Sequence, residues 1–191
     1  MKPLHLTLLA AVLGASALLL TGMDRNSAKP SVTDPVARGK YLATFGACND
    51  CHTPKKIGPN GPEDDLSRLL AGHPEDAKLP PPPDLRGNPW FVTTAGLTAW
   101  FGPWGISYAA NLTPDTNTGL GIWTEDMFIR AIREGKHMGY GRTILPPMPW
   151  QYFRELTDDD LKAIFAYLRS IPQVRNRVPD PVPPGGPARY E

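Results

Sequence analysis

Five consecutive residues constrain this chain more than any other feature: Cys48, Asn49, Asp50, Cys51 and His52. Two thiols one helical turn apart can each bond a vinyl group on one edge of a porphyrin, and the adjoining imidazole then lies under the iron. The CxxCH spacing is the attachment motif for c-type haem. It predicts one covalent haem c, with thioether bonds to Cys48 and Cys51 and with His52 as the proximal iron ligand.

Three other chemistries use closely spaced cysteines. A thioredoxin-like redox pair needs a βαβ context, and no such pattern surrounds the motif. A zinc site needs two more ligands at close spacing, whereas the chain has only 2 cysteines in all. A bare disulfide is the third alternative. The export signal and the helices described below favour haem over all three.

Length and composition narrow the class of protein. The length of 191 residues favours one domain with tails over a multidomain enzyme. Lysine and arginine number 20 against 19 aspartates and glutamates, so the formal net charge is +1 and the basic footprint of a nucleic-acid-binding protein is missing. The 23 prolines and 18 glycines predict a globule rich in loops.

The first 23 residues predict export. One lysine precedes an uninterrupted run of apolar and small residues from Leu6 to Leu20, which is the shape of a secretory signal. The run is short for a spanning helix, which needs roughly 20 residues, and no clear AxA cleavage box follows it. Residues 1–23 are thus expected to be a signal peptide or an N-terminal membrane anchor, followed by a linker over residues 24–33. Both interpretations predict a periplasmic protein, either soluble or anchored to the inner membrane.

Start and stop signals predict three helices: residues 35–45 after an Asp34–Pro35 cap, residues 125–134 between Thr124 and Gly135, and residues 158–171 after Thr157. Asp160, three residues after Thr157, completes a capping-box pattern. Residues 54–117 are rich in proline, glycine, asparagine and aspartate, and we expect little regular structure there. The sequence therefore predicts three helical stretches separated by long Pro/Gly-rich loops. The Pro-rich tail over residues 173–191 is expected to lie on the surface or to be disordered.

The second axial ligand is sought among the methionines and histidines. Met148 lies in the segment Leu145–Trp150, where three prolines fix the backbone and hold one side chain outward from a loop. A thioether opposite an imidazole raises the reduction potential and saturates the iron, which favours outer-sphere electron transfer. Met148 is the predicted distal ligand. The alternatives are that Met148 fills the core, or that His73 or His137 is the distal ligand.

Several segments resemble known haem modules. Residues 34–52 are similar to the N-terminal helix and haem motif of class I cytochromes c. Three other segments resemble the haem modules in cytochrome c subunits of bacterial membrane alcohol and gluconate dehydrogenases. They are residues 111–123, the axial-methionine loop Pro147–Trp150 and the C-terminal helix at residues 156–171. The resemblance covers residues 34–172, and residues 55–105 match least.

The resemblance implies an all-α class I cytochrome c fold over residues 34–172. It implies the same ligands as the motif, with Cys48 and Cys51 bonded to haem and His52 and Met148 on the iron. Those dehydrogenase subunits usually carry three such modules, whereas this chain has one.

Two finer contacts are also expected. The first and last helices would cross near Gly39, whose missing side chain permits close approach to Phe165 or Leu168. The proximal His52 would donate its second ring proton to a backbone carbonyl. Candidate acceptors are the carbonyls of Pro54, Pro59 and Pro114.

The expected function is electron transfer rather than catalysis by side chains. A monohaem cytochrome c would carry single electrons between a periplasmic or membrane dehydrogenase, or another respiratory complex, and an acceptor. Its expected partners are redox proteins, with a membrane contact through the N-terminal segment and no nucleic acid. One alternative is a haem enzyme or gas sensor with an open distal site. Another is a structural subunit of a larger respiratory assembly, in which the haem is one of several successive electron carriers.

Overall fold

The structure is a computed structural model that describes residues 34–186. The expected signal or anchor and the linker, residues 1–33, lie outside this range. The helices are α1 (Pro35–Phe45), α2 (Cys48–His52), α3 (Glu125–Glu134), α4 (Trp150–Phe153) and α5 (Asp158–Ser170). The strands are β1 (Lys55–Gly58), β2 (Gly61–Asp64), β3 (Val92–Thr93), β4 (Ala99–Gly102) and β5 (Gly105–Tyr108).

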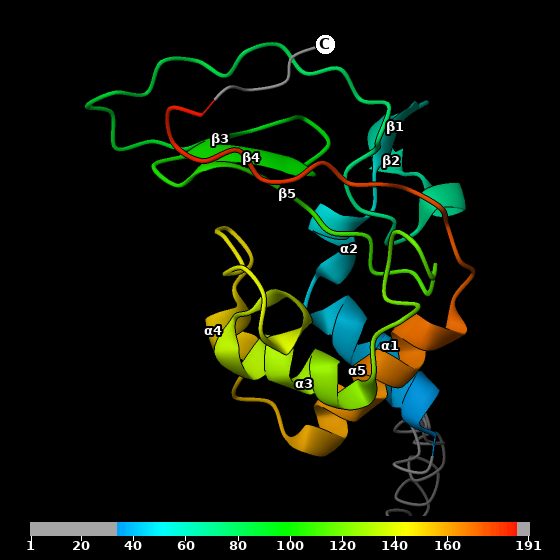
Figure 1. The fold of residues 1–191 in the computed structure, drawn as a ribbon. Coiled ribbons are helices and arrows are strands. Elements are labelled where there is room, and N and C mark those ends of the chain that lie inside the picture. Colours follow the sequence, from blue (N-terminus) through cyan, green and yellow to red (C-terminus); the bar gives the residue numbers. More distant parts are fainter. Residues whose placement is uncertain (1–33, 187–191) are drawn as a thin grey trace, which may run out of the picture.

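The elements form two layers (Figure 1). Helices α1, α3, α4 and α5 gather on one side, the sheet strands lie on the other, and α2 lies between them. Within residues 34–186, no helix has the length and apolar character needed to cross a membrane.

The three helices predicted from capping signals are present. The Asp34 carboxylate accepts hydrogen bonds from the backbone amides of Val36 and Ala37 at the start of α1. Helix α3 ends at Gly135, whose φ of 65° is left-handed and favours glycine. The Thr157 hydroxyl accepts from the Asp160 amide at the start of α5.

The predicted capping box at α5 is only half formed, because the Asp160 carboxylate has another partner. It accepts a hydrogen bond from Arg38 Nε at 2.9 Å and so links α5 to α1.

The expectation of an all-α fold is wrong. The segment expected to be irregular contains two antiparallel sheets, a β1–β2 hairpin and a three-stranded sheet in the order β3-β4-β5. Both hairpins turn at Gly-Pro-X-Gly sequences, residues 58–61 and 102–105. The same prolines and glycines that suggested irregular chain therefore form tight hairpin turns. Strands of 2 to 4 residues are also too short to show an alternating pattern in the sequence.

Helices α1 and α5 cross at Gly39, as predicted. A Cβ atom at this position would lie 1.8 Å from the Ala163 carbonyl oxygen and 2.8 Å from Tyr167 Cβ. The close neighbours are therefore Ala163 and Tyr167 rather than Phe165 or Leu168. Phe165 and Leu168 belong instead to the hydrophobic core, which joins α1, α3 and α5.

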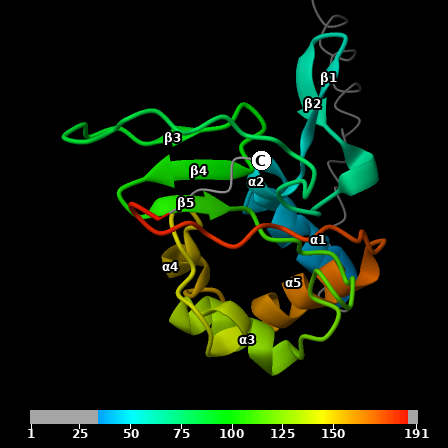
Figure 2. The same cartoon turned by 45° about the horizontal axis from the view of Figure 1, so that its top comes forward.

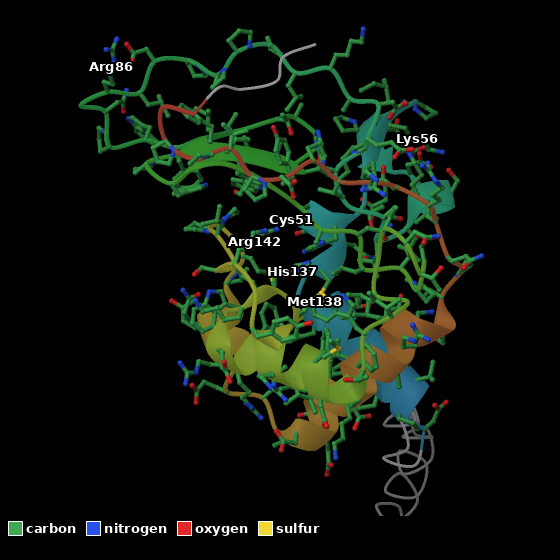
Figure 3. All side chains as sticks on the ribbon, viewed as in Figure 1. Cys51, Lys56, Arg86, His137, Met138 and Arg142 are labelled. Carbon is green, nitrogen blue, oxygen red and sulfur yellow. The ribbon has the colours of Figure 1, made fainter. Side chains whose placement is uncertain are left out.

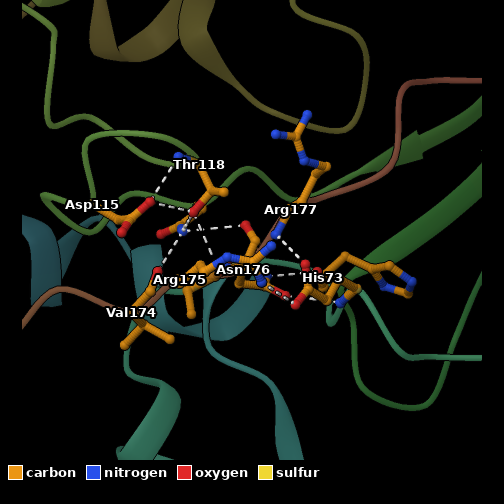
Figure 4. Close-up of polar contacts among 10 residues, drawn as sticks. His73, Asp115, Thr118, Val174, Arg175, Asn176 and Arg177 are labelled. Atoms are coloured by element: carbon orange, nitrogen blue, oxygen red, sulfur yellow. Dashed lines mark hydrogen bonds and ion pairs between the residues drawn. The ribbon is translucent and has the colours of Figure 1, made fainter.

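Residues 173–186 of the expected tail lie mostly on the surface, as one of the two expectations had it, and they are hydrogen-bonded to the rest of the domain. Residues 187–191 lie outside the described residues. We call residues 173–186 the C-terminal strap. Asn176 is 6% exposed. Its side-chain Nδ2 donates to the backbone carbonyls of Ala71 and His73 at 2.7 and 2.8 Å, and its Oδ1 accepts from the Glu75 backbone amide at 2.8 Å. Figure 4 shows these contacts.

Two further groups of contacts fix the strap. The Val174 carbonyl accepts from the Asn111 side chain at 2.8 Å, and the backbone amide of Asn176 donates to the Thr118 hydroxyl at 3.0 Å. Farther along, Val182 pairs with Ile106 of β5. The strap lies beside β5 in both views of the fold (Figures 1 and 2).

The contact at Gly39 makes a direct prediction. Replacing Gly39 with leucine should destabilise the holoprotein by at least about 3 kcal/mol, because a side chain would meet the α5 backbone. For a chain of this size, thermal unfolding should show a midpoint lower by about 10 °C. The control is Gly96→Ala, where the nearest heavy atom to a new Cβ is Thr98 Oγ1 at 3.8 Å. An unchanged midpoint in Gly39→Leu would contradict the crossing.

Candidate functional site

The CxxCH residues form the short helix α2, set at an angle to α1. Gly46 ends α1, and Ala47 then adopts a left-handed conformation with φ of 54° before α2 begins. The turn places Cys48 and Cys51 one helical turn apart. In the view of Figure 3, Cys51 lies between the helical layer and the sheets.

His52 is buried, with 9% of its surface exposed. Its Nδ1 lies 2.8 Å from the Ala110 carbonyl oxygen. Because a carbonyl can only accept, Nδ1 carries the proton and Nε2 keeps a lone pair that can bind a metal ion. Burial lowers the pKa of His52, which favours the neutral imidazole that metal binding requires.

The carbonyl that orients His52 belongs to Ala110, and not to Pro54, Pro59 or Pro114 as expected. No sequence signal could identify it, since every residue offers a backbone carbonyl. The Ala110 segment is placed by backbone bonds on both sides: the His73 amide donates to Ala109 at 2.9 Å, and the Leu112 amide donates to Leu70 at 2.9 Å.

The neighbouring segment, residues 70–73, also fixes the end of α2. The Gly72 amide donates to the His52 carbonyl at 2.7 Å. Gly72 has φ of 79°, and a Cβ there would lie 2.4 Å from the Ala109 carbonyl oxygen, so only glycine fits between the two strands of chain.

The two cysteine thiols are neutral and unpaired. Burial raises the pKa of Cys48 to about 11 and also raises the pKa of Cys51. A thioredoxin-like pair works through a thiolate of lowered pKa, so this environment disfavours that alternative. Both residues are free cysteines, and residues 34–186 contain no cluster of three or more His, Cys, Asp or Glu side chains suited to a metal ion.

Met148 and Cys48 are brought to the same core. Both side chains are partly buried and pack against the hydrophobic cluster that includes Leu120, Phe128 and Leu168. The predicted distal residue and the first predicted thioether site thus both contact the hydrophobic core. Assignment of Met148 to the iron stays a prediction.

His73 lies in the interior, and one of its two ring nitrogens, Nδ1, is hydrogen-bonded. The side chain is 2% exposed, Nδ1 lies 2.9 Å from the Thr98 hydroxyl, and the ring packs on Tyr108 with centroids 4.9 Å apart. Burial lowers its pKa to about 4. These contacts fix the His73 ring in the interior, and its assignment as an alternative distal ligand stays untested.

His137 and Met138 lie on the loop after α3, in the same region of Figure 3 as Cys51. The His137 ring meets the Trp123 ring edge-on at 5.2 Å. Met138 has φ of 56°, a left-handed conformation that is rare for a bulky residue. The sequence offers His137 as an alternative ligand, and the structure adds Met138 as a second thioether to be tested.

The donor set fits a covalent haem. Two neutral thiols stand one turn apart, and a buried imidazole follows them with one nitrogen committed to a carbonyl and the other available. These residues can hold a porphyrin by two bonds and its iron by a third.

Comparison with known proteins agrees with this chemistry. A sequence model of the family described as cytochrome c matches residues 36–172. The chain is 30% identical to a subunit of nicotinate dehydrogenase from Pseudomonas putida over 181 residues, covering 90% of this chain and 12% of that protein. It is 28% identical to the cytochrome c subunit of quinone alcohol dehydrogenase from Gluconobacter oxydans, covering 90% of this chain and 29% of that one.

A third relative is the cytochrome c subunit of gluconate 2-dehydrogenase from Pantoea cypripedii, 32% identical over 132 residues, with 69% of this chain and 22% of that subunit covered. The chain thus spans less than a third of the length of each of these relatives.

The burial of His73 predicts a pH dependence of stability. Its folded pKa of about 4 lies below its unfolded value of 6.5, so the unfolded state binds the extra proton between these values. The contribution to stability is fully present above pH 6.5 and is lost as the pH falls towards 4, by about 3 kcal/mol at most. Denaturant unfolding of the holoprotein across this range should show that slope in the wild type and a flatter one in His73→Gln. Equal slopes of stability against pH in the two proteins would refute the contribution of His73.

Proposed function

The chain belongs to the cytochrome c family, and from that premise we propose that it carries single electrons through one covalent haem c. Proteins of this family hold haem by the CxxCH cysteines. The observation that carries the proposal is His52, buried directly after the two free thiols with Nδ1 bonded to Ala110 and Nε2 available. When bound, the haem supplies a one-electron iron couple.

Each residue of the site has a defined task in this proposal. Cys48 and Cys51 would form the two thioether bonds, so the cofactor could not dissociate. His52 would bind the iron through Nε2, and its bond to Ala110 fixes the ring orientation and raises its basicity. Met148 would supply the second iron ligand and so block the binding of a gas or peroxide. The apolar core beside Met148 would limit water near the iron.

We further propose that the electron donor is a dehydrogenase. The relatives named above are subunits of nicotinate, alcohol and gluconate dehydrogenases, and two of the three are called cytochrome c subunits. In this proposal the chain performs no substrate chemistry of its own. It works in the periplasm after export by residues 1–23, either free or attached to the inner membrane.

The ligand on the distal side decides between electron transfer and an open haem site. Met148→Ala should keep the haem but lose the absorption band of iron–sulfur coordination, and its reduced form should bind carbon monoxide readily. Its reduction potential should fall by on the order of 0.1 V, a fraction of the roughly 0.8 V range set by axial ligands.

The matched control is Met138→Ala, which removes the thioether on the loop after α3. It should retain the band, the potential and the resistance to carbon monoxide. A wild type that lacks the iron–sulfur band and binds carbon monoxide at once would instead support a haem enzyme or gas sensor. Loss of the band in Met138→Ala alone would move the ligand to that residue.

A further inference from the structure

A polar contact connects the three-stranded sheet to the loop that carries Met148. Ser107 of β5 is 7% exposed, and its hydroxyl donates to the Pro146 carbonyl oxygen at 2.5 Å. The Trp104 indole Nε1 donates in turn to the Ser107 oxygen at 3.2 Å. Trp104 thus occupies an acceptor position of the hydroxyl and leaves its proton for Pro146, two residues before Met148.

Apart from the packing of Met148 on the core, the loop around this residue has few other hydrogen bonds. Pro146, Pro147 and Pro149 have no backbone N–H to donate. The nearest backbone bonds flank the loop: the Ile144 amide donates to Gly135 at 2.8 Å, and the Tyr152 amide donates to Pro149 at 3.0 Å. Between these two bonds, Ser107 supplies a hydrogen bond from outside the loop.

Ser107 is presented by a strand that is held on both edges. On one edge β5 pairs with β4, with Ile106 opposite Phe101. On the other edge Ile106 exchanges two backbone bonds with Val182 of the C-terminal strap, at 2.8 and 3.0 Å. A side chain on such an element keeps its position better than one on a free loop.

We propose that Ser107, oriented by Trp104, is a positioning residue for the distal ligand. Its bond to Pro146 fixes the loop two residues before Met148, so that the thioether would stay in place to bind the iron. The inference rests on the proposed function, since it takes Met148 as the ligand. It assigns a task to the three-stranded sheet: through Ser107 of β5, the sheet sets how firmly the methionine stays bound.

The test measures how readily the thioether leaves the iron of the holoprotein. Ser107→Ala removes one hydrogen bond, which should shift the balance towards methionine-free iron about fivefold. The pH at which the iron–sulfur band disappears in alkaline solution should fall by about 0.7 unit if one proton is exchanged. Carbon monoxide should bind the reduced form about fivefold faster. Trp104→Phe should shift both readouts in the same direction by a smaller factor, and Ser107→Thr, which keeps a hydroxyl, should restore them.

The matched control is Thr93→Val in β3. The Thr93 hydroxyl also donates to a backbone carbonyl of this sheet, that of Ala99 at 3.0 Å, but does not reach the Met148 loop. This variant should keep the wild-type exchange pH and carbon monoxide rate even if its unfolding temperature falls. The comparison separates positioning of the ligand from general loss of stability.

The proposal is overturned if Ser107→Ala and Thr93→Val give the same exchange pH and carbon monoxide rate. In that case a Met148→Ala variant without the band would show that the electron-transfer assignment stands and that only the positioning role fails. A wild type without the band would overturn both. If Ser107→Ala does not fold, Trp104→Phe decides by the same two readouts, and wild-type values in it count against the proposal.

Discussion

The hydrogen bond from His52 Nδ1 to the Ala110 carbonyl is the contact on which the site depends. It selects the tautomer, fixes the ring plane and leaves Nε2 available as a ligand. The two partners are 58 residues apart in the chain, so the bond forms only when the intervening segment has folded. Gly72 makes this possible, because it lets residues 70–73 lie against both the end of α2 and the Ala110 segment. A short sequence motif thus requires a large part of the domain for its geometry.

The chain between α2 and α3 serves both ligands of the proposed haem. Residues 70–73 bond to the chain beside Ala110, whose carbonyl accepts from His52. Strand β5 supplies Ser107, whose hydroxyl reaches the loop of Met148. The C-terminal strap connects the two parts, since Asn176 bonds to the Ala71 and His73 carbonyls while Val182 pairs with β5.

Local signals predicted well what depends on local chemistry. The caps at Asp34, Thr124 and Thr157 and the glycine at the α1–α5 crossing follow from backbone groups and sterics that neighbouring residues determine. Prediction failed where partners are distant or carry no side-chain signal. Short strands between Gly-Pro turns resemble irregular chain, the acceptor for His52 is a backbone carbonyl, and the capping partner expected of Asp160 was displaced by Arg38 on another helix.

Covalent attachment of haem at α2 can be tested by mass spectrometry of protein matured in a host that attaches c-type haem. The intact protein should carry the mass of one haem in addition to its polypeptide, and after proteolysis that mass should stay on the peptide that contains Cys48 and Cys51. A polypeptide without added tetrapyrrole mass, or haem that separates from it under denaturing conditions, would contradict the assignment of this site.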